Sequence, residues 1–324
     1  MQADAVPPFV SVIVPVYNDE QRIAICVKAL LAQDYQRDRY EVIVVDNGST
    51  DGSFAAVQPF PVMLLRETDT QSSFAARNLG LHHASGELFA FTDSDCTPAP
   101  TWLREGVAAL QSGADLVGGN VRFVFSPRPT GAEVCDSMAN MQMERNIRER
   151  GVAKTANLFA TKDVIAAIGP FPHDLRSGGD VIWTRRATSA GFQLVFCQKA
   201  EVAHPTRRLR ALLKKQYRVG HGQRAIRAEA RGRAVVPGAA PAAAGKHGGG
   251  GRLARLYRTL RGFLPEPLSS VRSSMAQSGV EGMVSPYRVW VAAWLARAAT
   301  TLGGLAEKWR TKAPKQGRGT YATK

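Results

Sequence analysis

The sequence reads FVSVIVPVYND at residues 9–19 and EVIVVDNGSTDGS at residues 41–53, and these two stretches decide the fold class. Each opens with β-branched and other apolar residues, which is typical of a buried strand, and ends in a polar cluster. Between them, Asp19–Gln33 has helical periodicity through Ile23 and Val27. This order of strand, helix and strand predicts a parallel βαβ unit.

The alternation continues along the chain and predicts an α/β, Rossmann-like domain: a mostly parallel sheet flanked by helices on both faces. Ligands bind such sheets at the carboxyl ends of the strands. Further strands are predicted at residues 62–65, 87–92, 115–118, 157–161, 193–196 and 200–203, and helices at 72–84, 101–111, 133–150 and 180–190.

Charge divides the chain of 324 residues unevenly. Met1–His204 holds 18 basic and 23 acidic residues, a net charge of −5, whereas Pro205–Lys324 holds 24 basic and 4 acidic residues, a net charge of +20. Such a cationic region favours phosphate-bearing partners. We predict a catalytic domain (1–224), a flexible Ala/Gly/Pro linker (225–251), a basic amphipathic helical region (252–309) and a disordered basic tail (310–324).

Apolar residues recur at helical spacing in the basic region. One stripe runs from Leu253 to Leu264, and a second comprises Val291, Trp294, Leu295, Ala298, Leu302, Leu305 and Trp309. The second stripe is too weakly hydrophobic, and Arg297 too costly, for a predicted transmembrane span. We expect an interfacial helix on an anionic membrane surface; the alternative is a helix packed on the catalytic domain.

Five polar side chains at or near strand ends point to a nucleotide-diphosphate site. Asp93 and Asp95 suit a divalent cation that bridges substrate phosphates. Asp46 can accept hydrogen bonds from a base or a ribose, and Tyr17 lies close by with an aromatic face. Arg77 offers a planar cation to the diphosphate.

Together these residues carry a resemblance. VSVIVPVYN, VIVVDNGSTDGS, AARNLG and FTDSDC, followed by ANLF at residues 156–159 and SGGD at 177–180, resemble the family 2 glycosyltransferases, which have the GT-A fold. The resemblance spans about residues 10–224 and includes His204, where the family often has a histidine, followed by Arg207. It implies inverting transfer of a sugar from a nucleotide-diphosphate donor, a UDP-sugar in particular.

The resemblance also implies individual roles. Pro15, Tyr17, Asp46, Arg77 and Asp93 would bind the donor nucleotide. Asp95 and Asp93, with His204 as a further candidate, would bind Mg²⁺ or Mn²⁺. Asn157 and Gly179 would line the sugar and acceptor pocket. Asp180 would be the general base that deprotonates the acceptor hydroxyl; the structural alternative for Asp180 is an N-cap. Asn47 and Ile182 stand where family members often have acidic residues.

The expected acceptor is a glycan or a lipid-linked glycan in surface polysaccharide biosynthesis, which is a family-level analogy. A nucleotidyltransferase and a catalytically silent sugar-nucleotide binder remain as alternatives. Nucleic-acid binding through the basic region is less favoured because no stacking platform accompanies its arginines, and no specific nucleic acid is expected. The four cysteines form no CxxC pair, and we expect reduced thiols in a cytoplasmic protein at the inner face of the membrane.

Overall fold

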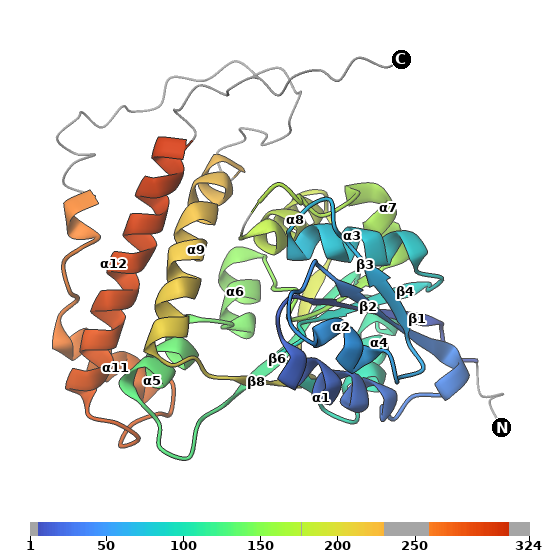
Figure 1. The fold of residues 1–324 in the computed structure, drawn as a ribbon, viewed down its shortest axis with the longest axis horizontal. Coiled ribbons are helices and arrows are strands. Elements are labelled where there is room, and N and C mark those ends of the chain that lie inside the picture. Colours follow the sequence, from blue (N-terminus) through green and yellow to red (C-terminus); the bar gives the residue numbers. More distant parts are fainter. Residues whose placement is uncertain (1–5, 176, 230–258, 311–324) are drawn as a thin grey trace.

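The computed structural model describes residues 6–175, 177–229 and 259–310. An eight-stranded sheet in the order β3-β2-β1-β4-β7-β6-β8-β5 forms the centre of the catalytic part, with helices on both faces (Figure 1). The strands are β1 Val10–Val16, β2 Tyr40–Asp46, β3 Met63–Arg66, β4 Leu88–Thr92, β5 Thr97–Pro98, β6 Leu116–Val124, β7 Asn157–Thr161 and β8 Leu194–Pro205.

The helices in the described residues begin with α1 and end with α12, with a short 3₁₀ helix, η1, at Arg37–Arg39. Those of the catalytic part are α1 Glu20–Leu31, α2 Ser53–Val57, α3 Ser73–His83, α4 Trp102–Gln111, α5 Gly131–Ala139, α6 Met143–Arg150, α7 Lys162–Ile168 and α8 Gly179–Ser189. Those that follow are α9 Leu209–Glu229, α11 Leu268–Gln277 and α12 Pro286–Arg310.

The first half of the sheet confirms the parallel prediction. β3, β2, β1 and β4 run parallel, and Val16 at the end of β1 pairs in register with Asp46 at the end of β2. β1 is buried along its whole length, and β2 nearly so, because helices cover both faces. The carboxyl ends of these strands therefore form one edge of the sheet, where the predicted polar clusters lie.

The second half of the sheet is mixed, not parallel. β7 runs antiparallel to both β4 and β6, and β5 runs antiparallel to β8, while β6 and β8 are parallel. The chain leaves β6 through α5 and α6 and returns into β7 between β4 and β6, so these pairs are not made by βαβ crossovers.

The two strands predicted at residues 193–196 and 200–203 are one strand, β8, with an irregularity in the middle. The register changes from Gly119 opposite Cys197 to Asn120 opposite Glu201. A Cβ at Gly119 would lie 2.2 Å from the Ala200 carbonyl oxygen, so only glycine fits beside this bulge.

The single polar helix predicted at residues 133–150 is wrong. α5 ends at Ala139, Met141 has a φ of 53°, and α6 begins at Met143. Gln142 Nε2 donates to the Ser137 carbonyl oxygen at 2.6 Å and so satisfies a carbonyl at the end of α5. α5 is also largely buried, because the C-terminal helices cover it.

α9 extends past the predicted domain boundary at residue 224. Its last residue, Glu229, accepts a hydrogen bond from Arg186 of α8 between Nε and Oε1 at 2.6 Å, so residues 225–229 are helix rather than linker. Residues 230–258 and 311–324, which include most of the predicted linker, the first part of the apolar stripe from Leu253 and the predicted basic tail, lie outside the described residues.

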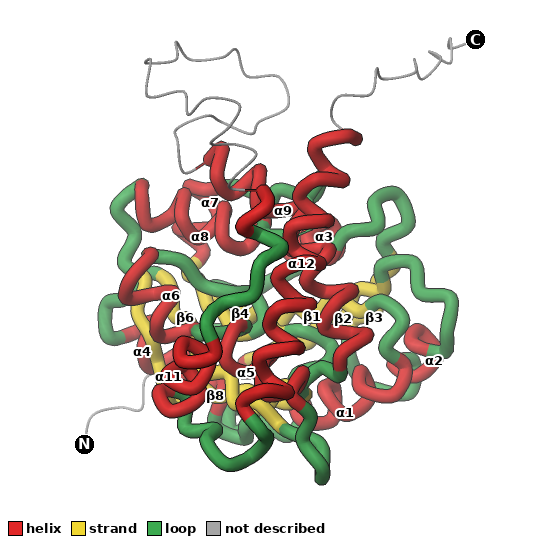
Figure 2. Tube along the Cα trace, turned by 90° about the vertical axis from the view of Figure 1, so that its left-hand side faces the viewer, coloured by secondary structure: helices red, strands yellow, loops and turns green. Residues whose placement is uncertain are grey.

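The C-terminal helices pack on the catalytic part and form a second core with it. Val289, Ala292 and Ala296 of α12 are buried against residues of α5, α9 and α11. Figure 2 looks onto this side, where α12 runs across the molecule beside α5 and α11. The structure therefore supports the packed alternative for this helix; the predicted region 252–309 begins outside the described residues.

The face of α12 that packs is not the predicted apolar stripe. The buried face consists of small residues, whereas the stripe from Val291 to Trp309 is exposed or half-exposed. By length and composition alone, Pro286–Trp309 is also apolar enough to cross a membrane, a property that core helices share. The inner face of α12 is covered by protein and its outer face is apolar.

Candidate active site

Side-chain hydrogen bonds join the loops that follow β1, β2 and β4. Asn18 Oδ1 accepts from the Thr50 backbone N–H at 2.8 Å, and the Asn18 N–H donates to Ser49 Oγ at 3.0 Å. Asp19 Oδ2 accepts from Ser94 Oγ at 2.8 Å. The polar clusters after three strands therefore meet at one edge of the sheet, as predicted.

Asp46 ends β2, and its side chain is fully buried. Its carboxylate accepts from the Ser49 backbone N–H at 3.3 Å and from Arg66 Nε at 3.2 Å. The Arg66 guanidinium lies 4.0 Å above the centroid of the Phe54 ring. Two donors thus hold the Asp46 carboxylate in one orientation, and its predicted contact with a base or a ribose stays a prediction.

Tyr17 and Pro15 occupy different environments at the end of β1. Tyr17 follows the strand and has 47% of its surface exposed, and its neighbour Val16 pairs with Asp46. Its ring is available at the edge where the nucleotide was predicted. Pro15 is buried within β1 opposite Val45, so its predicted contact with the nucleotide stays a prediction.

Arg77 and Asp93 form an ion pair between α3 and the loop after β4, from the Arg77 guanidinium to Asp93 Oδ1. Arg77 is almost fully buried, yet its Nε has no hydrogen-bond partner among the described residues. An unpaired buried donor is costly, by about 1–3 kcal/mol, and is a candidate contact for an anionic ligand. Asp93 therefore pairs with Arg77, and it is not part of the group that Asp95 forms with Cys96 and His204.

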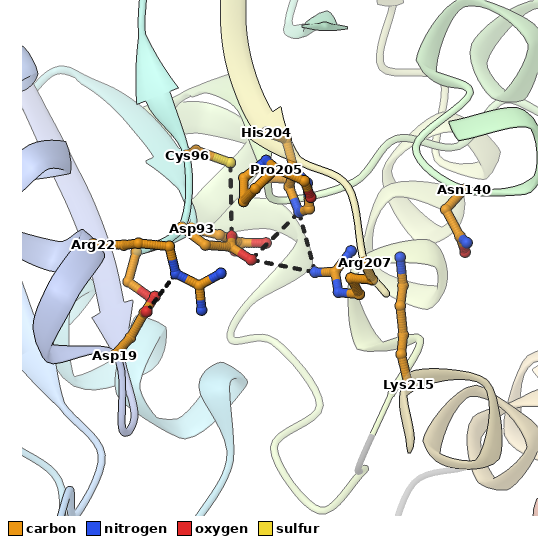
Figure 3. Close-up of polar contacts among 12 residues, drawn as sticks. Asp19, Arg22, Asp93, Cys96, Asn140, His204, Pro205, Arg207 and Lys215 are labelled. Atoms are coloured by element: carbon orange, nitrogen blue, oxygen red, sulfur yellow. Dashed lines mark hydrogen bonds and ion pairs between the residues drawn. The ribbon is translucent and has the colours of Figure 1, made fainter. Parts of the chain in front are cut away.

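His204 and Arg207 lie beside each other (Figure 3), and the Asp95 carboxylate faces both of them. Asp95 Oδ2 lies 3.5 Å from His204 Nε2 and 3.2 Å from the Arg207 guanidinium, which also lies 3.1 Å from His204 Nε2. His204 Nδ1 lies 2.7 Å from the Pro205 carbonyl oxygen, an acceptor, so Nδ1 carries the proton and Nε2 presents a lone pair.

These two lone pairs fit a divalent cation. A carboxylate oxygen and an imidazole nitrogen lie 3.5 Å apart, and a cation bound there would compete with the Arg207 guanidinium, which contacts both atoms. Mg²⁺ and Mn²⁺ favour carboxylate oxygens, and imidazole is an accepted ligand. Cys96 lies in the same group, with ligand atoms within 4.8 Å of one another, but its thiol is a poor ligand for hard cations.

The pKa shifts agree with this assignment. Burial opposes ionisation of Asp95, but the attraction of His204 and Arg207 outweighs it and holds the pKa of Asp95 below its usual value. Burial lowers the pKa of the His204 imidazole, and the attraction of Asp95 opposes this only in part. Burial and the nearby carboxylates raise the pKa of Cys96 well above its usual value, so it stays a thiol.

Asp136 and Lys215 complete the network and were missed by the sequence analysis. Asp136 is fully buried in α5; its Oδ2 lies 3.4 Å from the Arg207 guanidinium and accepts from the Arg207 backbone N–H at 3.0 Å. Lys215 Nζ of α9 lies 3.4 Å from Asp136 Oδ1. No motif marks Asp136, because its helix was predicted to be polar and exposed. Arg207 therefore joins Asp95, at the carboxyl edge of the sheet, to Asp136 in α5, a helix that contributes to the second core.

Asp180 is the second residue of α8 and not its N-cap, which is Gly178. Its Oδ1 accepts from the adjacent Val181 N–H at 2.8 Å, and its Oδ2 lies 4.0 Å from Lys154 Nζ. The Asp180 side chain is 14% exposed. The N-cap alternative is therefore wrong, and the role of Asp180 as general base stays a prediction.

The turn before Asp180 lies between α3 and α9. A Cβ at Gly179 would lie 2.8 Å from the Phe74 ring, and one at Gly222 would lie 2.1 Å from the Ser177 carbonyl oxygen. Gly178 has a φ of 85°, which favours glycine. Close packing therefore sets the position of the predicted general base. Gly222, the last residue of the Gly220-His221-Gly222 run in α9, therefore also has a packing role.

Asn157 is buried at the start of β7 and its side chain is already engaged. Its Nδ2 donates to the carbonyl oxygens of Asn120 and Ala200 at 2.8 Å each, and its Oδ1 accepts from Trp102 Nε1 at 2.9 Å. The side chain joins α4 to β6 and β8 inside the core. The predicted sugar contacts of Asn157 and Gly179 stay predictions.

Comparisons with known proteins agree with the fold described above. Residues 11–157 match the sequence profile described as "Glycosyl transferase family 2". The chain is 42% identical over 305 residues to "Glycosyltransferase AglE" of Haloferax volcanii, an alignment that covers 92% of this chain and 95% of the relative.

Two solved structures share the fold. The mannosyltransferase PcManGT from Pyrobaculum calidifontis, in complex with GDP-Man and Mn²⁺, aligns with a TM-score of 0.60 and 21% identity over 94% of this chain and 89% of that chain. Glucosyl-3-phosphoglycerate synthase from Mycobacterium tuberculosis, in complex with Mn²⁺, UDP and glucosyl-3-phosphoglycerate, aligns with a TM-score of 0.51 and 20% identity over 71% and 81%. With a full-length relative at 42% identity and this shared fold, the chain belongs to glycosyltransferase family 2 and is a glycosyltransferase with the GT-A fold.

Proposed function

We propose that the protein is an inverting, cation-dependent glycosyltransferase that uses a nucleotide-diphosphate sugar, a UDP-sugar in particular. The acceptor is a hydroxyl of a glycan or of a lipid-linked glycan in surface polysaccharide biosynthesis. The observation that carries this proposal is the pair of lone-pair donors, Asp95 Oδ2 and His204 Nε2, at the same sheet edge as Asp46 and the Arg77–Asp93 pair. Base, diphosphate and cation contacts are thus available along one edge.

Each group has one task in this mechanism. Asp46 accepts hydrogen bonds from the base or ribose, and Arg77 contributes positive charge near the diphosphate. Asp95 and His204, with Asp93 as a further candidate, would hold Mg²⁺ or Mn²⁺, which neutralises charge on the departing nucleoside diphosphate. Arg207 lies beside this site and adds a cation that the leaving group can contact.

Asp180 acts on the acceptor. Its carboxylate takes the proton of the acceptor hydroxyl as the oxygen forms a bond to the anomeric carbon. The bond from that carbon to the diphosphate oxygen breaks in the same displacement, and nucleoside diphosphate leaves. One positioned carboxylate is sufficient because no covalent enzyme intermediate forms. Attack from the face opposite the leaving group inverts the anomeric configuration.

We place this activity at the cytoplasmic face of an anionic membrane. The net charge of +20 over Pro205–Lys324 and the exposed apolar stripe of α12 support this placement. Each basic residue near an anionic surface contributes about 1 kcal/mol, so a few of them are sufficient for attachment.

The test is a panel of UDP- and GDP-sugars with Mn²⁺ or Mg²⁺, read out by release of nucleoside diphosphate. We expect one donor to be turned over and Asp180→Asn to lower transfer at least about a hundredfold. Asp180→Asn should keep the thermal stabilisation that Mn²⁺ and UDP give the wild type. Asp163→Asn, an exposed carboxylate on α7, is the matched control and should retain transfer.

Two results would contradict the proposal. Release of pyrophosphate instead of nucleoside diphosphate would indicate a nucleotidyltransferase. Stabilisation by a sugar nucleotide, without turnover of any donor in the presence of lipid-linked and soluble acceptors, would indicate a silent binder.

A further inference from the structure

An apolar groove lies where the start of α9 and the N-terminal half of α12 meet the start of α5. It encloses about 380 Å³. Leu209, Val291 and Leu295 contribute apolar walls, and Arg208 and Arg288 lie among its lining residues. No acidic side chain lines the groove in the part of the chain that the structure describes. The groove therefore combines apolar walls with two positive charges.

The groove continues into the exposed stripe of α12. Val291 and Leu295 belong to both, and Leu302 and Trp309, which are 50% and 75% exposed, lie farther along the same face. Val291 and Trp309 are 18 residue steps apart, which is about 27 Å of helix. The opposite, small-residue face is buried against α9. An extended hydrocarbon chain could thus lie along α12 and end in the groove.

The end of this surface that holds Arg208 is connected to the active site through the neighbouring residue Arg207. Arg208 follows Arg207 directly, and Arg207 contacts Asp95 and His204. Arg208 and Arg288 are exposed, and neither forms an ion pair with a residue that the structure describes. Two such arginines beside apolar walls match an anionic head on a long hydrocarbon chain. A head group bound here would lie beside the machinery that transfers the sugar.

We propose that the groove and the outer face of α12 bind the lipid phosphate of a lipid-linked acceptor. Arg208 and Arg288 bind the phosphate, and the wall formed by Val291 and Leu295 takes the adjoining hydrocarbon. This inference rests on the proposed function in taking the acceptor to be lipid-linked. A soluble glycan would leave the apolar stripe uncovered, and bulk phospholipid is the rival ligand that the test must separate.

The experiment measures binding of the full chain to nanodiscs without any sugar nucleotide. Three discs are compared: neutral phospholipid, neutral phospholipid with a polyprenyl monophosphate, and phosphatidylglycerol at matched charge. We expect binding to the polyprenyl phosphate disc to be at least about tenfold tighter than to the phosphatidylglycerol disc, a difference of about 1.4 kcal/mol. Arg208→Gln with Arg288→Gln should remove that preference, and so should Leu295→Asp.

The matched control is Arg218→Gln with Arg272→Gln, two exposed arginines on α9 and α11 that lie outside the groove. It removes the same charge and should keep the preference. Stabilisation by Mn²⁺ and UDP checks that each variant is folded. Equal binding to both anionic discs, or an equal loss in the control, would overturn the inference in favour of a general membrane surface. The binding experiment contains no sugar nucleotide. Failure of the protein to turn over any donor would therefore contradict the proposed function without changing the measured preference for polyprenyl phosphate.

Discussion

Arg207 connects the carboxyl edge of the sheet to α5, the helix against which the C-terminal helices pack. Its guanidinium contacts Asp95 and His204 at the catalytic edge and Asp136 in α5. A divalent cation bound by Asp95 and His204 competes with Arg207 for the same lone pairs. The carboxylate of Asp136 offers Arg207 a second partner, so the network can admit a cation without leaving a buried charge unpaired.

The first prediction concerns the cation site. Asp95→Asn replaces a carboxylate ligand by a neutral amide, which binds divalent cations weakly. We expect the variant to lose the Mn²⁺-dependent part of the stabilisation by UDP, and to lose transfer activity at least about a hundredfold. Differential scanning fluorimetry with and without Mn²⁺ measures the first effect. Asp38→Asn, which changes an exposed carboxylate on η1, should behave as the wild type. An unaltered Mn²⁺ response in Asp95→Asn would exclude this cation site.

The second prediction concerns Lys215. Burial and Arg207 lower the pKa of Lys215 to about 8, from 10.5, although Asp136 opposes the shift. Below pH 8 the ammonium is charged in the folded and unfolded states and its burial lowers stability. Between pH 8 and 10.5 the unfolded chain binds more protons at this site, so stability rises with pH.

Lys215→Met removes this titration. The free energy of unfolding of the wild type should rise relative to that of Lys215→Met between pH 8 and 10.5, by up to about 3 kcal/mol. Urea unfolding of both proteins on either side of pH 8 measures the difference. A constant difference across that range would show that Lys215 keeps an ordinary pKa.

Among the elements, α9 and α12 approach each other through glycines. A Cβ at Gly303 would lie 1.9 Å from the Tyr217 carbonyl oxygen, and one at Gly220 would lie 2.1 Å from the Thr300 carbonyl oxygen. The glycines of the Gly220-His221-Gly222 run let α9 lie against α12 and against the turn before Asp180. His221, between these glycines, lies 2.9 Å from Glu307 of α12.

The third prediction uses two adjacent glycines in α12. Gly303→Ala forces the backbones apart and should lower the free energy of unfolding by about 1–3 kcal/mol. Gly304→Ala is the matched control, because its Cβ would lie 3.5 Å from the Gly220 carbonyl oxygen, an ordinary contact. It should be neutral or raise stability by up to about 1 kcal/mol through helix propensity. If the two substitutions change the free energy of unfolding in urea equally, the close crossing of α9 and α12 at Gly303 is contradicted.

At the scale of the whole molecule, the C-terminal helices are part of the fold rather than an appendage. The second core contains Val134 of α5, Leu212 of α9, Val271 of α11 and Val289 of α12. Figure 1 shows α9, α11 and α12 lying together beside the sheet domain. The predicted boundary at residue 224 would cut α9 and uncover this core.

The fourth prediction follows from that boundary. A chain ending at residue 224 should be insoluble or lose cooperative unfolding, since burial of each large apolar side chain contributes about 1.5–3 kcal/mol. A chain ending at residue 310 removes only residues 311–324 and should unfold as the full chain does. Solubility and circular-dichroism melting curves measure both. A soluble, cooperatively folded short chain would support the division made from the sequence.

Much of the catalytic edge could be predicted because its determinants are local. Apolar strands such as residues 9–15 and 41–45 and the polar residues that follow them are visible in the sequence, and parallel strands place their ends together. Asp136 and Lys215 could not be predicted, because their roles come from a contact between α5 and α9, which no local pattern encodes. Asn157 was predicted in a sugar pocket, but its hydrogen bonds inside the core depend on β6 and β8.

The sequence by itself determined the family, the parallel half of the sheet and the set of polar residues at its edge. Only the tertiary structure decided that β7 inserts antiparallel, that α5 and α6 are separate, and that α12 buries its small-residue face and exposes its apolar stripe. The physical reason is that hydrophobic periodicity identifies an apolar face but not its partner. At the α9–α12 crossing, close backbone approach through glycines determines which face is covered.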